Sequence, residues 1–296
     1  MRGSNLRYLA TAFFLIICGN SAQACQTSAV TVELADRTFN AALEAIGAAR
    51  SSEDWSKIRL QLECLSENRY APASELLASL LLGSELGAPD LVSVHKYLQI
   101  AFEDGNAERR RDIANSYLFG KFDGRELGVD VNTAIEYFVQ ASRLGDSDAS
   151  ASLCSIFRSD LYKVQDYRSA IDYCTIAADQ GDPLSEITAA ELLYEHGDYP
   201  SDSEEATKLY FRSALRGSNT GPMGLGRAYE EGVGVLQDFM LAHAWYNIAS
   251  SRLGPGNQEE AAEARDRVAR NLSSDQIIDA QTLAKQILAD MASFAP

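Results

Sequence analysis

The sequence predicts an all-α fold of tandem helix-turn-helix repeats with a helical cap at each end. Three observations support this fold class. From residue 78 onwards, small residues recur at intervals of 36, 40, 36 and 36 positions. Bulky residues follow each of them at helical spacing, and a glycine closes each unit. Such a period is typical of solenoids, because one helical pair cannot bury its faces alone and neighbouring pairs must stack.

The first 24 residues have the pattern of a secretory signal peptide. Two arginines precede an apolar run that extends to Cys18, and the small-residue sequence AQA ends at Ala24. We expect cleavage after Ala24 and export to the periplasm or the cell exterior. Cys25 would then begin the mature chain. A lipid on Cys25 is the alternative, and only that modification would attach the protein to a membrane.

The charge balance disfavours one class of partner. The chain has 42 acidic and 26 basic residues, for a formal net charge of −16. A nucleic-acid-binding protein needs a basic stripe that neutralises phosphates, so we expect no nucleic-acid partner. With 46% hydrophobic residues, the chain can bury a large core.

Residues 25–69 are predicted to form an N-terminal helical cap or a degenerate repeat. Two amphipathic helical patterns run from Val30 to Ala49 and from Ser51 to Leu65. Ser51 and Asp54 have the spacing of a capping box at the start of the second helix.

Residues 70–254 are predicted to hold five repeats, each a pair of helices. The first helix of each pair carries a small residue that lets the second helix approach closely: Ala78, Ala114, Cys154, Ala190 and Gly226. The second helix carries a matching position: Val94, Ala134, Ala170, Ala206 and Ala242. Each second helix is followed by a glycine suited to a left-handed cap: Gly105, Gly145, Gly181, Gly217 and Gly254.

Two segments depart from this repeat. The second unit has four extra residues between Gly120 and Asp130, and because both helices keep their register, we expect the insertion in the turn, as a surface loop. Residues 255–296 are predicted to form a C-terminal cap of two helices, Glu259 to Asn271 and Ser274 to Ser293. A capping box of Ser273 and Gln276 would start the last helix.

The fifth unit carries a resemblance to a known family. Leu225-Gly226, the turn sequence GVGV and Trp245-Tyr246 resemble the Sel-one-like repeats, which are relatives of the tetratricopeptide repeat. The resemblance covers about residues 71–290. It implies a right-handed α/α superhelical solenoid that binds other proteins or assembles complexes.

Exported bacterial members of that family suggest a function. The resemblance implies an exported protein-binding scaffold or adaptor of the bacterial envelope, which would regulate a sensor kinase through its concave face. The alternative is a structural subunit of an envelope assembly, such as a flagellar motor, a polysaccharide-export machine or a secretion machine. A cell-wall-acting hydrolase is the third reading and has the least support. The sequence does not identify the partner, the binding surface or the oligomeric state.

The cysteines predict a disulfide framework. Cleavage after Ala24 would leave Cys25, Cys64, Cys154 and Cys174, an even number that allows three pairings. Cys154 and Cys174 occupy the close-packing positions of the two helices of one repeat, which favours a disulfide between them over two buried thiols. Cys25 and Cys64 would then pair by elimination.

The sequence predicts neither an enzyme nor a cofactor. Ser93 and Lys96 formally match an S-x-x-K motif, but the companion K-T-G and S-D-N motifs are missing. No sequence pattern of metal ligands occurs, and the three histidines are scattered.

Two groups of residues are candidates for binding a partner. One is the basic cluster Arg109, Arg110 and Arg111, which is either a docking patch for an acidic segment or an ordinary solvated helix face. The other group follows from analogy with tetratricopeptide grooves, where first helices line the concave side: Arg111, Asn115, Glu191, Tyr194 and Arg227.

Overall fold

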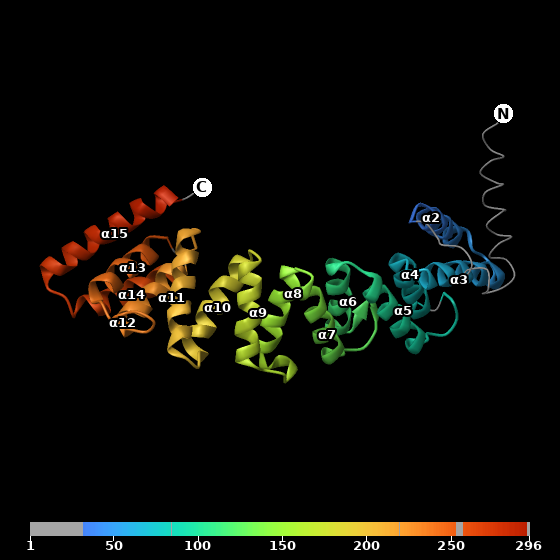
Figure 1. Cartoon of the computed structure of the whole chain (residues 1–296), viewed down its shortest axis with the longest axis horizontal. Helices are drawn as coiled ribbons and strands as arrows, with labels where there is room; N and C mark the ends of the chain where they lie inside the picture. Colours follow the sequence, from blue (N-terminus) through green and yellow to red (C-terminus); the bar gives the residue numbers. More distant parts are fainter. Residues whose placement is uncertain (1–31, 84, 219, 253–256, 295–296) are drawn as a thin grey trace, which may run out of the picture. The chain divides into compact units, whose positions relative to one another are not determined.

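The computed structural model describes residues 32–83, 85–218, 220–252 and 257–294, most of which form α-helices (Figure 1). The predicted signal peptide and Cys25 lie outside these residues, so cleavage, export and lipidation stay predictions. The chain divides into two compact units, Met1–Leu144 and Gly145–Pro296. None of the described helices is long and apolar enough to span a bilayer.

Unit 1 contains the predicted N-terminal cap helices and the first two predicted pairs. Its described elements are α2 Val32–Ala48, α3 Ser52–Glu67, α4 Ala71–Leu82, α5 Leu91–Asp104, α6 Ala107–Phe119, β1 Lys121–Phe122, β2 Arg125–Glu126 and α7 Val131–Arg143. The pairs are α4 with α5 and α6 with α7, and the two helices of each pair pack on one another.

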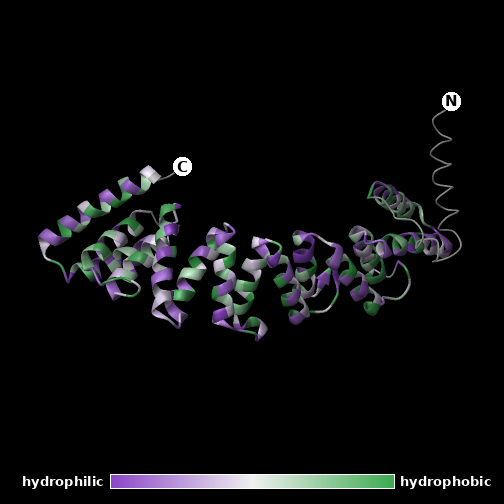
Figure 2. Ribbon diagram, viewed as in Figure 1, coloured by the Kyte–Doolittle hydropathy of each residue, from purple (hydrophilic) through white to green (hydrophobic). Residues whose placement is uncertain are grey.

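Unit 2 contains three further pairs and the C-terminal helices. Its described elements are α8 Ser147–Arg158, the short 3₁₀ helix η1 Asp160–Tyr162, α9 Tyr167–Asp179, α10 Pro183–His196, α11 Pro200–Leu215, α12 Gly221–Glu231, α13 Phe239–Arg252, α14 Asn257–Ala269 and α15 Ser274–Phe294. The last two helices both pack on α13. Around α15, hydrophilic and hydrophobic residues alternate (Figure 2), and its buried Ala284 and Met291 join the unit 2 core.

The helix starts follow the predicted capping residues. Ser51 caps α3 and forms the reciprocal capping box with Asp54. At the start of α15, the Ser273 backbone N–H donates to Gln276 Oε1 at 2.9 Å, and the Gln276 N–H donates to Ser273 Oγ at 3.3 Å. Both predicted capping boxes are therefore confirmed.

The predicted glycine caps are confirmed in three places and wrong in one. Gly145, Gly181 and Gly217 have φ angles of 93°, 104° and 84°, in the left-handed region. Gly105 is instead extended, with φ −82° and ψ 155°. α5 continues to Asp104, so Gly105 is itself the C-cap residue, whereas Gly145 and Gly181 lie one residue beyond the C-caps Leu144 and Gln180, at the position that favours the left-handed conformation. Gly254 lies outside the described residues.

The two helices of each pair contact one another at the small residues of the repeat. On the first helices, Ala78, Ala114 and Ala190 are fully buried and Cys154 is 3% exposed. All five matching positions on the second helices are 0% exposed. The predicted close approach of the two helices is therefore confirmed, and large side chains such as Phe138 and Tyr246 fill the space beside it.

The α12–α13 pair shows this constraint most clearly. A Cβ atom at Gly226 would lie 2.6 Å from ring carbons of Tyr246, which is 1% exposed. No larger residue than glycine fits unless the Tyr246 ring moves.

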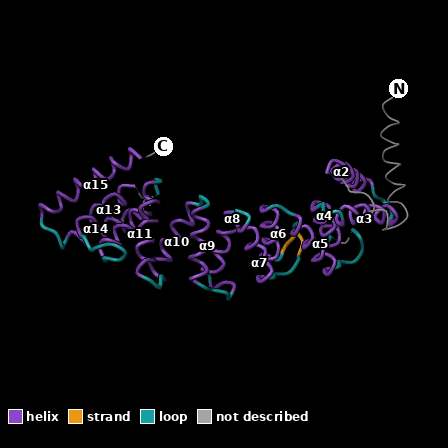
Figure 3. Tube along the Cα trace, in the orientation of Figure 1, coloured by secondary structure: helices purple, strands orange, loops and turns teal. Residues whose placement is uncertain are grey.

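The insertion in the second pair forms a β-hairpin. In the described residues it is the one place with strands (Figure 3), and Lys121 pairs with Glu126 and Phe122 with Arg125. Asp123 and Gly124 have φ angles of 49° and 74°, as a tight two-residue turn requires.

The hairpin does not stand free of the helices as the expected surface loop would. Arg125 Nη2 donates to Glu85 Oε1 at 2.8 Å, and its Nη1 donates to Ser79 Oγ at 2.9 Å. The insertion is in the turn, as predicted, and it ties the second pair to the turn region of the first.

Unit 2 contains the predicted disulfide between Cys154 on α8 and Cys174 on α9, with Cα atoms 5.0 Å apart and a sequence separation of 20. Both cysteines belong to the buried core of unit 2. Cys64 is 6% exposed on α3, and its predicted partner Cys25 lies outside the described residues.

The Gly226–Tyr246 contact makes a prediction about stability. Gly226→Ala should lower the free energy of unfolding by about 1–3 kcal/mol, because the added methyl group overlaps the buried Tyr246 ring. The matched control is Gly47→Ala on α2, where a Cβ would meet nothing within 4 Å. That change should be neutral or stabilising by up to about 1 kcal/mol. Urea unfolding followed by circular dichroism measures both, and equal effects would contradict this account of the pair.

The disulfide makes a second prediction. Replacing both cysteines, Cys154→Ala with Cys174→Ala, should lower the free energy of unfolding by about 2–4 kcal/mol, because the unfolded chain loses a cross-link. Urea unfolding without reductant measures the loss. As a control, a reductant should destabilise the unchanged protein more than the double variant. An unchanged free energy of unfolding in the variant would show that the bond does not brace this pair.

Candidate functional site

Two adjoining grooves lie along the first helices of the unit 2 pairs. The α8–α10 groove has a volume of about 710 Å³, and its lining includes Ala151, Leu184 and Ile187. The α10–α14 groove has a volume of about 520 Å³ and is lined mainly by α10, α12 and α14. Glu191 and Thr220 line both. We call the surface formed by the two grooves the first-helix face of unit 2.

The repeat period places side chains in rows along this face. Ser155, Glu191, Arg227 and Glu263 are spaced 36 residues apart in the sequence, and each of them lines one or both grooves. The last member lies on α14. This helix packs on α13 and supplies groove residues at the same register, so it extends the series of first helices by one. Residues 255–296 were predicted only as a cap, and the continued period was the signal that could have revealed this row.

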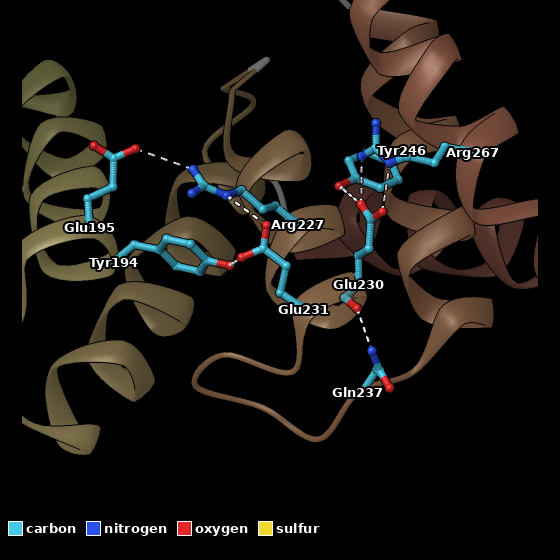
Figure 4. Close-up of polar contacts among 8 residues, drawn as sticks. All are labelled: Tyr194, Glu195, Arg227, Glu230, Glu231, Gln237, Tyr246 and Arg267. Atoms are coloured by element: carbon cyan, nitrogen blue, oxygen red, sulfur yellow. Dashed lines mark hydrogen bonds and ion pairs between the residues drawn. The ribbon is translucent and has the colours of Figure 1, made fainter. Parts of the chain in front are cut away.

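Arg227 lies at the centre of a polar cluster between α10 and α12 (Figure 4). Its guanidinium carbon is 4.4 Å from the centre of the Tyr194 ring. Its Nη1 lies 3.3 Å from Glu195 Oε1, and its Nε lies 3.3 Å from Glu231 Oε1. The Tyr194 hydroxyl donates to Glu231 Oε2 at 2.5 Å. An aromatic face with carboxylates at its edge is a suitable environment for a guanidinium.

A second cluster joins α14 to α12 and α13 (Figure 4). Arg267 forms two parallel hydrogen bonds to Glu230, from Nε to Oε1 and from Nη2 to Oε2, both at 2.8 Å. The Tyr246 hydroxyl donates to Glu230 Oε2 at 2.6 Å, and Gln237 Nε2 donates to the Glu230 carbonyl at 2.8 Å. These bonds hold α14, the last helix of the first-helix series, in place. They therefore stabilise one wall of the α10–α14 groove.

Two carboxyl groups, Glu191 on the face and Glu230 beside it, differ in the direction of their pKa shifts. Hydrogen bonds from Arg267 lower the pKa of Glu230, against the opposing effect of burial. Burial raises the pKa of Glu191, and the nearby Glu195 carboxylate raises it further, while Arg158 and Arg227 act in the opposite direction. Glu230 is therefore stabilised as an anion. The negative charge of Glu191, by contrast, is not fully offset by Arg158 and Arg227.

Glu186 has a structural role at the edge of the α8–α10 groove. Its side chain is 1% exposed, and its Oε2 accepts a hydrogen bond from Arg216 Nη1 at 2.6 Å and lies 3.1 Å from Arg212 Nε. Arg212 also approaches Asp179 at 3.5 Å. The cluster connects α9, α10 and α11, and a buried carboxylate held in this way is not available to a partner.

The structure brings three of the predicted partner-binding residues together. They come from two first helices: Glu191 and Arg227 line the α10–α14 groove, and the Tyr194 ring stacks against Arg227. Glu195 and Glu231, which complete the Arg227 cluster, were not predicted from the sequence. The members of the second cluster, Glu230, Tyr246 and Arg267, were not predicted either. The four-residue spacing of Glu191 with Glu195 and of Arg227 with Glu231 was the available signal, because such residues share a helix face.

The basic cluster of unit 1 makes contacts within that unit. Arg109 lies 3.4 Å from Glu75, and Arg111 lies 3.5 Å from Asp112. Arg110 stacks 4.9 Å from the centre of the Phe102 ring and donates to two carbonyl groups at the end of α5. Asn115 is half-buried on α6. These contacts favour the structural interpretation of the cluster, and partner binding there stays a prediction.

Ser93 and Lys96, which match the S-x-x-K motif, lie near the start of α5. The Ser93 hydroxyl donates to the capping carboxylate of Asp90 at 2.6 Å, and the Lys96 ammonium lies 5.3 Å from the centre of the Tyr97 ring. Among the residues that the structure describes, no cluster of histidine, cysteine and acidic side chains could hold a metal ion.

A family comparison matches the helix pairs. The Sel1 repeat model matches residues 113–146, 152–182, 189–218 and 223–252, which correspond to the pairs α6–α7, α8–α9, α10–α11 and α12–α13. The chain contains four Sel1 repeats. Sel1 repeat proteins generally act as scaffolds for protein–protein interaction and are typically not enzymes. The α4–α5 pair precedes the matched stretches, so the count of five repeats stays a prediction.

A similar solved structure supports the same fold, an all-α helical-repeat solenoid. A Sel1 repeat protein from Oxalobacter formigenes aligns with a TM-score of 0.59 and 20% identity, over 89% of this chain and 80% of that one. A protective antigen of uropathogenic Escherichia coli with an SLR fold aligns with a TM-score of 0.48 and 21% identity, over 88% of this chain and 53% of that one.

One curated relative has detectable sequence similarity. It is the ERAD-associated E3 ubiquitin-protein ligase component HRD3 of Candida glabrata, 26% identical over 199 residues. The match covers 64% of this Sel1 repeat chain and 22% of that protein. The chain therefore spans only about a fifth of the length of that relative.

The Glu230 cluster predicts a pH-dependent contribution to stability. Because the pKa of Glu230 lies below its ordinary value of 4.5, the carboxylate stabilises the fold at neutral pH, and this contribution is lost as pH falls through the lowered pKa. Glu230→Gln should therefore lower the free energy of unfolding by about 1 kcal/mol at neutral pH, a modest value because Arg267 is partly screened by water. The difference from the unchanged protein should shrink in acid.

Urea unfolding at several pH values checks this prediction. Glu204→Gln is the matched control, because Glu204 is exposed on α11, and it should have no effect at any pH. A loss of stability in Glu230→Gln that is the same at acidic and neutral pH would contradict the role given to the carboxylate.

Proposed function

We propose that this Sel1 repeat protein is an exported scaffold of the bacterial envelope that binds a segment of a partner protein on the first-helix face of unit 2. The observation that supports this most directly is the pair of adjoining grooves, of about 710 and 520 Å³, which share Glu191 and Thr220. Together their lining residues come from the first helices α8, α10, α12 and α14, and a groove between helices can accept a helix or an extended segment of a partner.

The chemistry of the face fits binding rather than catalysis. In and beside the grooves, the charged groups Arg227, Glu230 and Arg267 are each held by an oppositely charged side chain and contact a tyrosine. Groups held in this way shape a surface, whereas a catalytic acid or base must be able to exchange a proton with a substrate. The Cys154–Cys174 disulfide in the pair beside the α8–α10 groove is consistent with an oxidising compartment.

The partner that we favour is the extracytoplasmic part of a sensor kinase, which the scaffold would restrain. The resemblance to exported bacterial Sel1 repeat proteins motivates this choice. A structural role in a motor or an export machine would use the same face for a different partner, so identification of the bound protein separates the two.

Site-specific photo-cross-linking tests the proposal. A photoreactive amino acid replaces Leu184, which lines the α8–α10 groove and is 73% exposed, in cells of the source organism. The matched control replaces Leu236, which is 90% exposed in a turn outside both grooves. We expect a protein adduct from position 184 and far less from position 236, with the partner identified by mass spectrometry.

The outcomes of the cross-linking experiment are distinct. A kinase fragment in the adduct supports regulation, and a motor or export component supports an assembly role. Equal adducts at both positions, or none at position 184, would overturn the assignment of the face.

A further inference from the structure

The carboxylates of the α10–α14 groove outnumber its cations. Five glutamates and two arginines line it: Glu191, Glu195, Glu231, Glu260, Glu263, Arg227 and Arg267. Both arginines are already paired within the protein, Arg227 with Glu195 and Glu231, and Arg267 with Glu230. The groove therefore presents a surplus of negative charge to a ligand.

Three of these carboxylates are without an ion-pair partner in the part of the chain that the structure describes. Glu191 lies on α10, and Glu260 and Glu263 lie on α14, all with exposed side chains. Burial and the neighbouring Glu195 both raise the pKa of Glu191, so this anion would gain stability from a nearby cation. No three carboxylates among the described residues lie close enough to hold a metal ion. Separate cationic groups therefore fit the groove better than a single metal ion.

The floor of the groove suits long cationic side chains. Gly224 has no side chain, and a Cβ atom there would lie 2.4 Å from ring carbons of Tyr210, so the tyrosine ring lies directly against the backbone of α12. The Arg227 cluster shows how this surface holds a guanidinium. The guanidinium of Arg227 lies over the Tyr194 ring, and the carboxylates of Glu195 and Glu231 are its ion-pair partners. A lysine or arginine from a partner would find the same combination of ring and carboxylate.

The adjoining α8–α10 groove is more apolar and less acidic. Ala151, Ile187 and the 73% exposed Leu184 give it apolar walls. Its charged lining residues are Arg158, Arg216, Asp182, Glu186 and Glu191. Glu186 is paired with Arg216, so the surplus of negative charge is smaller than that of the α10–α14 groove. Because Glu191 lies where the two grooves meet, the change from apolar to acidic surface occurs along one path.

We propose that the occupant of the first-helix face is an amphipathic protein segment with two parts. Its apolar side chains lie in the α8–α10 groove, and its lysine or arginine side chains lie in the α10–α14 groove beside Glu191, Glu260 and Glu263. This inference rests on the proposed function and adds the chemistry of the partner, through charge complementarity at the acidic end.

The test uses the full chain and a labelled probe peptide with leucines in one half and lysines in the other, prepared in both orders. The comparison peptide has glutamate in place of every lysine. Fluorescence anisotropy should show that a lysine peptide binds and that salt weakens the binding, because the groove–lysine attraction is screened. The glutamate peptides should bind far more weakly.

Matched charge variants locate the binding site. Combining Glu191→Gln, Glu260→Gln and Glu263→Gln should weaken lysine-peptide binding about tenfold, because three partly screened ion pairs are lost. The control combines Glu204→Gln, Asp275→Asn and Asp279→Asn, which removes the same charge from exposed positions outside the grooves. It should change the affinity by about twofold or less. Circular dichroism verifies that both variants fold.

Two results would overturn the inference. One is equal binding of the lysine and glutamate peptides. The other is an equal loss of affinity in the two triple variants, which would mean that the lysines respond only to the overall charge of −16. If the cross-link from position 184 forms but neither lysine peptide binds, the proposed partner chemistry is wrong and the scaffold function stands. If that cross-link is absent, the proposed function itself fails.

Discussion

The close approach of the two helices in each pair is the constraint on which the rest of the structure depends. A small side chain at the crossing lets the backbones come together, and a large side chain one turn away fills the remaining space. At Gly226 the approach is so close that ring carbons of Tyr246 lie 2.6 Å from the position that a Cβ would take. At Cys154 and Cys174 the same approach brings two thiols within bonding distance. One geometric requirement therefore accounts for the repeated small residues, the buried aromatic rings and the disulfide.

The first-helix face of unit 2 follows from the same constraint. When equivalent pairs stack at a fixed period, equivalent first-helix residues form rows, as Glu191, Arg227 and Glu263 do. The chemistry of the face then depends on substitutions within a row. In the row of Glu191, Arg227 and Glu263, the sign of the charge alternates from one first helix to the next. Arg227 is paired within the protein. Internal pairing, rather than composition, decides which charges a partner meets.

The arginines of both units illustrate this point. The arginine triplet of unit 1 has local carboxylates and helix-end carbonyls as partners. In unit 2, Arg267 uses its guanidinium to hold α14 against α12. The arginines thus help to fix the positions of helices, and several glutamates of the first-helix face are left exposed. The first-helix face therefore presents carboxylates to the solvent, and tyrosine rings line its α10–α14 groove.

The sequence by itself determined the helices, their pairing, two capping boxes and the position of the Cys154–Cys174 disulfide, because all of these depend on local spacing or on the period of the repeat. It also placed Glu191, Tyr194 and Arg227 on first helices. Only the tertiary structure decided that Gly105 is extended, that the hairpin of the second pair bonds back through Arg125, and that α14 continues the groove. The same holds for the Glu230 cluster. Its members are far apart in the chain, and they become neighbours only when the stacked helices bring their faces together.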